Sequence, residues 1–251
     1  MTMKKVKINF NFNNFLIAAI FLLSSLQVYP QLQSINIFSD YTQSGTKRLA
    51  VTRADAVGGG VGIYFKVTDF LSLGLVGGYQ LYSINQDSAL TQWDWYFWNV
   101  RYRGSVQADL ADSALKLSAT FNPIQKMDFL PIVLNFKSDF SVLEKLTVSP
   151  VLGGGVIFYT RRLYLEEDWT RKFDKIDYTF SYRYRNFADD KKGNPFFVMG
   201  GINLSYQFSE IASLTADFVY NHIIKTEGKY GYDQLPFENS YGIKVGLNFL
   251  Y

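Results

Sequence analysis

Bulky apolar residues alternate with small or polar residues along several stretches of the chain, with a period of two. Between residues 70 and 82, one set is Leu71, Leu73, Leu75, Tyr79 and Leu81, and the other is Ser72, Gly74, Gly78 and Gln80. The same alternation runs through residues 198–208 and 241–251. Because successive side chains of a β-strand point to opposite faces, this period predicts strands rather than helices.

The residue types on the two faces indicate what surrounds these strands. A soluble β-sandwich places Lys, Glu and Thr on its outward face, but here one face is bulky and apolar and the other is rich in Gly, Ser and Asn. A barrel in lipid has its apolar side chains outside and its small or polar ones inside. About 9–11 residues per strand are enough to cross the bilayer at a tilt. We therefore predict an all-β, transmembrane, antiparallel up-and-down β-barrel.

The lengths of the connections predict the number of strands. Seven strands are visible, at residues 50–66, 70–84, 128–140, 146–160, 195–208, 213–224 and 239–251. Short connections alternate with long ones, and outer-membrane barrels have short periplasmic turns and longer extracellular loops. On this basis the first visible strand runs towards the periplasm and needs a partner before it, which residues 33–42 supply. We predict eight strands; a further hairpin formed by residues 93–103 and 114–121 would make ten.

Residues 1–30 have the layout of a secretory signal peptide. Three lysines among the first seven residues precede an unbroken apolar run at residues 15–23 and a polar exit. A helix of that run, at about 1.5 Å per residue, is too short for a hydrocarbon layer of about 30 Å. We expect cleavage between residues 29 and 33 and a barrel domain over residues 31–251; the alternative is a buried N-terminal helix.

The composition excludes several classes of function. The 251 residues contain no Cys and one His, which excludes a disulfide scaffold, a thiolate zinc site, a Cys nucleophile and a histidine metal cluster. Lys and Arg number 25 and Asp and Glu number 22, so removing the three leader lysines (25 − 3) leaves 22 of each sign. Nucleic acid is therefore not an expected partner. The 22 Phe, 18 Tyr and 4 Trp favour a β-rich chain.

The single histidine, His222, does not form a recognisable catalytic site. A lipid-processing or hydrolytic site needs a His base with a nearby Ser and a carboxylate or Asn. The same-face neighbours of His222 are Tyr220 and Ile224, and its parity places it on the lipid side with Phe218. We expect an interfacial histidine in an aromatic girdle, no enzymatic activity, no cofactor and no metal.

The last eight residues follow the pattern polar–x–Gly–x–x–apolar–x–aromatic, set by Lys244, Gly246, Phe249 and Tyr251. This pattern resembles the β-signal by which outer-membrane barrels are handed to their assembly machinery. Other Gly-rich and aromatic stretches are similar to the small outer-membrane β-barrel protein family, which includes porin-like and heat-modifiable barrels of eight strands. These stretches are residues 129–136, 148–156, 203–208 and 214–218. The resemblance implies the fold, the outer membrane and the assembly machinery as a partner, but not an activity.

Four charged residues fall on the inward parity of the predicted strands: Lys66, Lys137, Asp217 and Lys244. Eight strands enclose an interior that side chains can fill, unlike porins of about 16–18 strands. Charges in such an interior must be paired or hydrated. We expect an internal network of ion pairs and water, and the alternative is a narrow porin-like channel for small solutes.

Two of the long loops are dense in aromatic residues and arginine. The candidates are Trp93, Trp95, Trp98, Arg101 and Arg103 in one loop and Tyr182, Arg183, Tyr184 and Arg185 in the other. In one interpretation both segments are strand extensions above the bilayer, with Arg contacting outer-membrane lipid and lipopolysaccharide phosphates. In the other they bind a surface glycan or a partner protein, because Trp, Tyr and Arg dominate binding hot spots. We predict a non-enzymatic outer-membrane protein with a surface-binding, adhesive or envelope-structural role.

Overall fold

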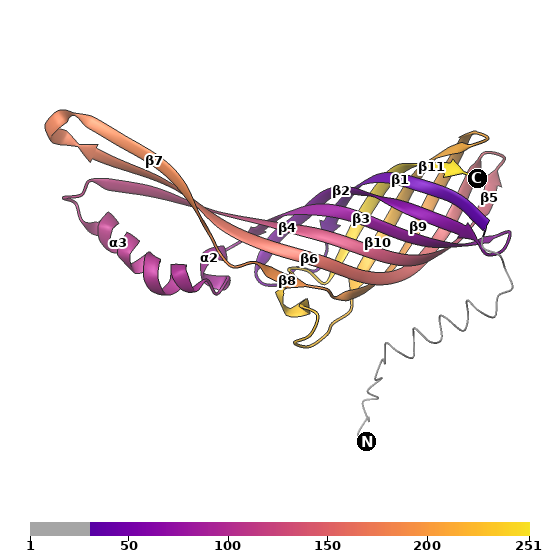
Figure 1. The fold of residues 1–251 in the computed structure, drawn as a ribbon, viewed down its shortest axis with the longest axis horizontal. Coiled ribbons are helices and arrows are strands. Elements are labelled where there is room, and N and C mark those ends of the chain that lie inside the picture. The colour runs from indigo at the N-terminus through magenta and orange to yellow at the C-terminus, as the bar shows by residue number, and fades with distance from the viewer. Residues whose placement is uncertain (1–30) are drawn as a thin grey trace, which may run out of the picture. The chain divides into compact units, whose positions relative to one another are not determined.

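The computed structural model describes residues 31–251, so the predicted signal peptide lies outside the described residues. Eight long antiparallel strands pair into a closed ring (Figure 1). They are β1 (Gln31–Ser44), β2 (Val51–Lys66), β3 (Leu71–Gln86), β4 (Leu117–Ser138), β6 (Leu146–Phe173), β9 (Phe196–Ser209), β10 (Ala212–Ile223) and β11 (Asn239–Leu250). The ring closes where β1 pairs with β11, in register from Ser34 opposite Leu250 to Ser44 opposite Ser240. The predicted eight-stranded barrel is confirmed.

The outer surface of the ring is apolar, as the alternation predicts. Exposed apolar side chains come from all eight strands, among them Ile37, Val57, Leu75, Ile132, Leu152, Ile202, Phe218 and Val245. The buried parity carries polar side chains, among them Asn36, Ser72, Gln80, Asn135, Ser149 and Thr215. This arrangement is the reverse of a soluble barrel and matches a lipid environment.

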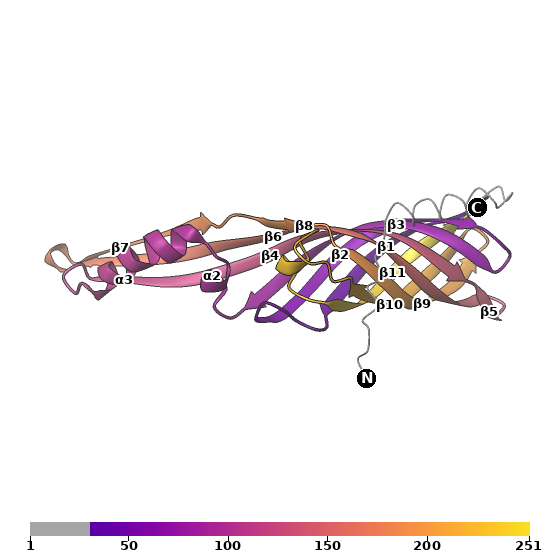
Figure 2. The ribbon, with the colours of Figure 1, turned by 90° about the horizontal axis from the view of Figure 1, so that it is seen from below.

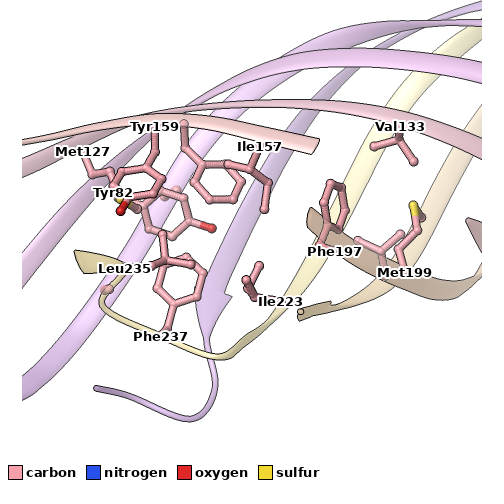
Figure 3. Packing of buried hydrophobic residues seen from close by; sticks show 14 of the residues in the cluster. Tyr82, Met127, Val133, Ile157, Tyr159, Phe197, Met199, Ile223, Leu235 and Phe237 are labelled. Carbon is pink, nitrogen blue, oxygen red and sulfur yellow. The ribbon is translucent and has the colours of Figure 1, made fainter. Parts of the chain in front are cut away.

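The interior is filled at the end where the long loops lie. Ten labelled side chains in Figure 3 belong to one apolar cluster, to which Tyr82, Phe129, Leu235 and Phe237 contribute. The Phe237 ring centroid lies 5.2 Å from that of Tyr82 and 6.1 Å from that of Phe129. Phe237 belongs to the β10–β11 connection, which contains the short helix η3 (Tyr232–Gln234) and folds inward. A cavity of about 30 Å³ remains inside the barrel, with Asp40 and Lys244 in its lining.

Two strands continue past the barrel and build a second structure, which we call the lobe (Figures 1 and 2). Residues 117–126 of β4 pair with residues 162–171 of β6, and β7 (Tyr178–Phe187) pairs with the far half of β6. The helices α2 (Ala89–Gln92), η1 (Phe97–Tyr102) and α3 (Arg103–Ala111) complete it. The strands predicted at 128–140 and 146–160 were therefore too short, because β4 and β6 stay paired beyond the barrel.

Three short elements complete the described chain: β5 (Phe140–Leu143), η2 (Asp174–Ile176) at the tip of the β6–β7 hairpin, and β8 (Lys191–Gly193). The ten-stranded alternative is wrong, since residues 97–111 are helical and residues 117–121 extend β4 instead of forming a new hairpin. Within residues 31–251, no helix is long and apolar enough to cross a membrane.

We expect the barrel wall to be sensitive to added volume where strands approach closely. A Cβ atom at Gly155 would overlap the backbone oxygen of Ile132 on the neighbouring strand, whereas a Cβ at Gly77 would meet nothing within 4 Å. Gly155→Ala should lower the free energy of unfolding by about 1–3 kcal/mol. Gly77→Ala, the control, should change it by less than about 0.5 kcal/mol. Urea unfolding of refolded protein, followed by unboiled gel mobility, measures both; equal midpoints would contradict the close approach.

Candidate functional site

The lobe has its own apolar core. Its buried members are Ala89, Trp93, Trp95, Trp98, Leu163, Leu165 and Ala188. The side chains of Trp93, Trp95 and Trp98 are only 3%, 7% and 8% exposed, and the Trp93 indole donates to the backbone oxygen of Asp189 at 3.0 Å. These three tryptophans, expected at a binding surface, belong mainly to the core of the lobe, and Trp98 also lines a pocket at its surface.

The expectation that residues 93–103 form a strand extension is also wrong. Trp95, Trp98 and Tyr102 are three and four positions apart, so a helical turn places them on one side. Their rings form a chain of contacts, with Trp98 centroids 6.5 Å from Trp95 and 6.0 Å from Tyr102. Trp98 also meets Phe121 of β4 edge-on at 5.8 Å. The helical spacing was present in the sequence, but the alternation with Arg101 and Arg103 concealed it.

A buried carboxylate joins the helices to the sheet. Glu167 of β6 is fully buried, and its Oε2 accepts hydrogen bonds from the Tyr102 hydroxyl at 2.8 Å and the Trp169 indole at 2.9 Å. Its Oε1 accepts from the Asn186 amide of β7 at 2.6 Å, and the Tyr184 hydroxyl contacts that of Tyr102. Three donors therefore satisfy, through charge-assisted hydrogen bonds, a carboxylate that has no basic partner among residues 31–251.

This network changes the acidity of the two tyrosines. Burial raises the pKa of the Tyr102 hydroxyl, and its hydrogen bonds to Tyr184 and Glu167 raise it further. Burial also raises the pKa of Tyr184. Both hydroxyls therefore keep their protons to a higher pH in the folded lobe than in an unfolded chain.

The opposite face of the lobe sheet carries exposed ion pairs. Arg183 and Arg185 of β7 stand opposite Asp168 and Glu166 of β6 in the strand register. The Nε of Arg183 lies 2.5 Å from Asp168 Oδ1, and Nη2 of Arg185 lies 2.5 Å from Glu166 Oε1. The two arginines therefore lie at the surface of the lobe. Exposed pairs of this kind contribute little to stability.

The strand β7 is an uncovered edge. Its only pairing partner among the described residues is β6. Tyr178, Phe180 and Tyr182 share one face and are 51%, 45% and 41% exposed. The Tyr182 ring is parallel to that of Trp169, with centroids 6.4 Å apart. An apolar strand with a free edge is typical of an interaction site.

The other two candidate arginines are exposed on the lobe helices. Arg101 lies over the Tyr96 ring at 5.6 Å. Arg103 lines a pocket of about 270 Å³ together with Trp98. The structure thus separates the loop candidates into buried tryptophans, paired arginines on β7, and a pocket that joins Trp98 to Arg103.

Of the predicted lumen charges, three lie within the ring and one at its rim. Lys66 pairs with Asp69 at 2.8 Å next to the short β2–β3 turn. Lys137 lies 3.4 Å from Asp139, and Asp217 accepts a hydrogen bond from the Asn203 amide at 2.6 Å. Lys244 stands opposite Asp217 in the β10–β11 register, with its Nζ 4.7 Å from the Phe38 ring centroid.

The C-terminal motif occupies the last strand of the ring. Phe249 and Tyr251 point outward and are exposed, whereas Gly246 packs against Phe38 on the inner side. His222 is exposed on the outer parity of β10, beside Phe218 and Tyr220. Residues 31–251 contain no group of three or more His, Asp or Glu side chains that could hold a metal ion.

A closed ring of eight antiparallel strands with an apolar outer band defines a transmembrane β-barrel of the outer-membrane type. No protein-family model and no curated protein matches the sequence. Among solved structures, the chain is similar to Neisserial surface protein A, with 10% identity, a TM-score of 0.45, and coverage of 87% of this chain and 96% of that chain.

Two further solved structures show a similar relationship. The attachment invasion locus protein Ail of Yersinia pestis has 9% identity and a TM-score of 0.39, covering 88% of this chain and 99% of that one. The outer membrane protein OprG of Pseudomonas aeruginosa has 11% identity and a TM-score of 0.42, covering 88% and 97%. At these identities the likeness is one of fold alone.

We expect Glu167 to hold the lobe together without supporting the barrel. Glu167→Ala leaves the Tyr102, Trp169 and Asn186 donors unsatisfied, at a cost of about 1–3 kcal/mol each. The lobe should then become open to protease while the unboiled gel mobility of the barrel is unchanged. Glu166→Ala, which removes only an exposed pair on the other face, is the matched control. Equal protease resistance of the two variants would contradict this role.

The raised tyrosine pKa values predict a loss of lobe stability at alkaline pH. Above about pH 10 the tyrosines of an unfolded chain ionise, while those of the folded lobe keep their protons. The stability that the folded lobe gains from its protonated tyrosines is complete below about pH 10 and is lost as the pH rises through the folded pKa values. Protease resistance of the lobe should therefore fall with rising alkaline pH, and less steeply in Tyr102→Phe. An identical profile in Tyr102→Phe and in the exposed control Tyr178→Phe would contradict the assignment.

Proposed function

We propose that this outer-membrane barrel is a non-enzymatic surface-binding protein whose lobe faces the cell exterior. The observation that carries the proposal is β7, a ten-residue edge strand with an exposed aromatic face on a sheet that leaves the barrel. Spanning a bilayer needs about 9–11 residues per strand. The 28 residues of β6 therefore extend well beyond the need of the membrane.

The lengths of the connections support this direction of the lobe. The short turns, at residues 67–70 and 210–211, lie at the end of the ring where β11 ends, and the lobe rises from the other end (Figure 1). Outer-membrane barrels direct their short turns to the periplasm and their long loops to the exterior. We infer that the lobe lies among lipopolysaccharide and surface polymers, with Arg183 and Arg185 near their phosphates.

The absence of enzymatic activity is part of the proposal. His222 lies on the outer, lipid-facing parity between aromatic neighbours, and no hydrogen bond or ion pair connects its imidazole to any described residue. A general base needs a partner within hydrogen-bond reach. We also propose that Lys244, Gly246, Phe249 and Tyr251 act as the assembly signal, since the motif occupies the strand that closes the ring.

We expect surface binding to depend on the aromatic face of β7. The triple variant Tyr178→Ser, Phe180→Ser and Tyr182→Ser should keep the barrel and the lobe core. Its adsorption to purified lipopolysaccharide, glycan arrays or matrix proteins should fall about tenfold or more, because exposed aromatic anchors dominate binding energy. Thr179→Ala with Ser181→Ala changes the opposite face of the same strand and serves as control. A folded triple variant that binds as the wild type does would refute the proposal.

The alternative function, a narrow porin-like channel, meets a filled interior. The aromatic cluster around Tyr82, Phe129 and Phe237 occupies the ring at the lobe end. We expect no steady unitary current from the wild-type protein in planar bilayers. Replacing residues 230–237 by a Gly/Ser linker should remove part of the plug inside the barrel and give a current. The gel shift then reports that the strand ring remains closed and folded. Steady current from the wild type would favour the channel.

A further inference from the structure

The pocket of about 270 Å³ on the lobe combines an apolar wall with hydroxyl groups and one basic side chain. Leu90, Trp98 and Pro123 contribute the apolar surface, and Ser88 and Thr91 contribute hydroxyls. Arg103, at the start of α3, contributes a guanidinium group. No acidic side chain is in this lining, so the pocket carries a single, positive formal charge.

The guanidinium group of Arg103 is not used within the lobe, whereas the Thr91 hydroxyl donates to the backbone oxygen of Ser88 at 2.9 Å. Arg103 is exposed, and its guanidinium group makes no ion pair, hydrogen bond or ring contact with residues 31–251, while its backbone N–H donates to the backbone oxygen of Trp98. Two arginines of the lobe sheet differ from Arg103, because Arg183 and Arg185 are paired with Asp168 and Glu166. The Trp98 indole N–H likewise has no acceptor among residues 31–251. A ligand that offers acceptors would meet unpaired donors.

The backbone around the pocket is unusual at two points. Ser88 has a φ of 57°, a left-handed conformation that is uncommon for a residue with a side chain. Trp98 lies in η1, a π-helix. Strained residues and π-helical turns persist where the surrounding structure holds them, and they cluster at ligand sites. Here both border the same pocket.

We propose that this pocket binds an anionic monosaccharide unit of a surface polysaccharide. The volume lies just below the range of about 300–1,000 Å³ for pockets of drug-sized ligands, which fits a single sugar ring. The guanidinium of Arg103 matches the two oxygens of a carboxylate or phosphate. This inference rests on the proposed surface-binding function and names a ligand class for the lobe.

The test uses the refolded full chain in detergent micelles at physiological ionic strength, with binding measured by calorimetry. Glucuronate and glucose 1-phosphate are the probes, and glucose is the neutral control. The two anions distinguish a carboxylate-bearing polymer from a phosphate-bearing lipopolysaccharide core. We expect one of them to bind about tenfold or more tightly than glucose, since a charge-assisted pair is lost with the neutral sugar.

Three variants locate the binding. Arg103→Gln should weaken the anion about tenfold or more, and Thr91→Trp, from an exposed position, should fill the pocket and abolish binding. Arg101→Gln removes an equal charge two residues away, outside the pocket lining, and should leave the affinity unchanged. Unchanged gel mobility and protease resistance confirm that each variant is folded.

Several results would overturn the inference: no anion binding by the wild type, equal binding of glucose, or equal losses in Arg101→Gln and Arg103→Gln. The last would indicate general attraction to a basic surface. Failure of the pocket is distinguishable from failure of the surface-binding function. If Arg103→Gln and Thr91→Trp still adsorb to whole lipopolysaccharide or matrix while β7 variants do not, the function stands and the pocket has no part in it.

Discussion

Closure of the strand ring is the constraint on which the whole molecule depends. Hydrocarbon offers no hydrogen-bond partners, so each unsatisfied backbone group costs several kcal/mol and an open sheet edge is not tolerated. The pairing of β1 with β11 removes the two free edges that these strands would otherwise leave in the ring. Once the backbone groups are satisfied in this way, the outward-facing side chains can be apolar. The small and polar side chains, which alternate with them along each strand, then point into the interior.

The pairing of β4 with β6 explains how the lobe is held. The β4–β6 register continues without a shift from Lys137 opposite Val151 to Leu117 opposite Arg171. The lobe sheet is therefore an extension of the barrel wall, and its orientation is set by backbone hydrogen bonds rather than by a flexible linker. Outside the lipid, edges are permitted, and β7 keeps one. The buried Glu167 then ties the helices to this sheet through donors from η1, β6 and β7.

Much of the barrel was predictable because a half-buried strand records its two environments residue by residue. The parity of residues 70–82 and 241–251 is that of the structure, and seven of the strand starts lie within two residues of those expected; β4 begins at Leu117 rather than at 128. The lobe was less predictable. Its strands and helices pack against each other and not against lipid, so the residues 93–103 mix a helical spacing of aromatics with an alternation of Arg. The periodicity of a single sequence does not distinguish a helix from a strand in this segment. Contacts of Trp98 with Phe121 and of Tyr102 with Glu167 stabilise the helix.

The barrel and the lobe are each stabilised by an apolar core of their own. The cluster around Phe237 fills the ring, and the cluster around Trp98 fills the lobe, with different residues in each. Distant sites that share no partners contribute nearly independently to stability, so side chains of the lobe away from Trp93, which contacts Arg161 at the ring, can change at little cost to the membrane-spanning part. A binding surface on paired strands also loses less conformational entropy on association than one on mobile loops. The filled ring supplies a rigid base, and the freedom to vary lies in β7, Arg103 and their neighbours.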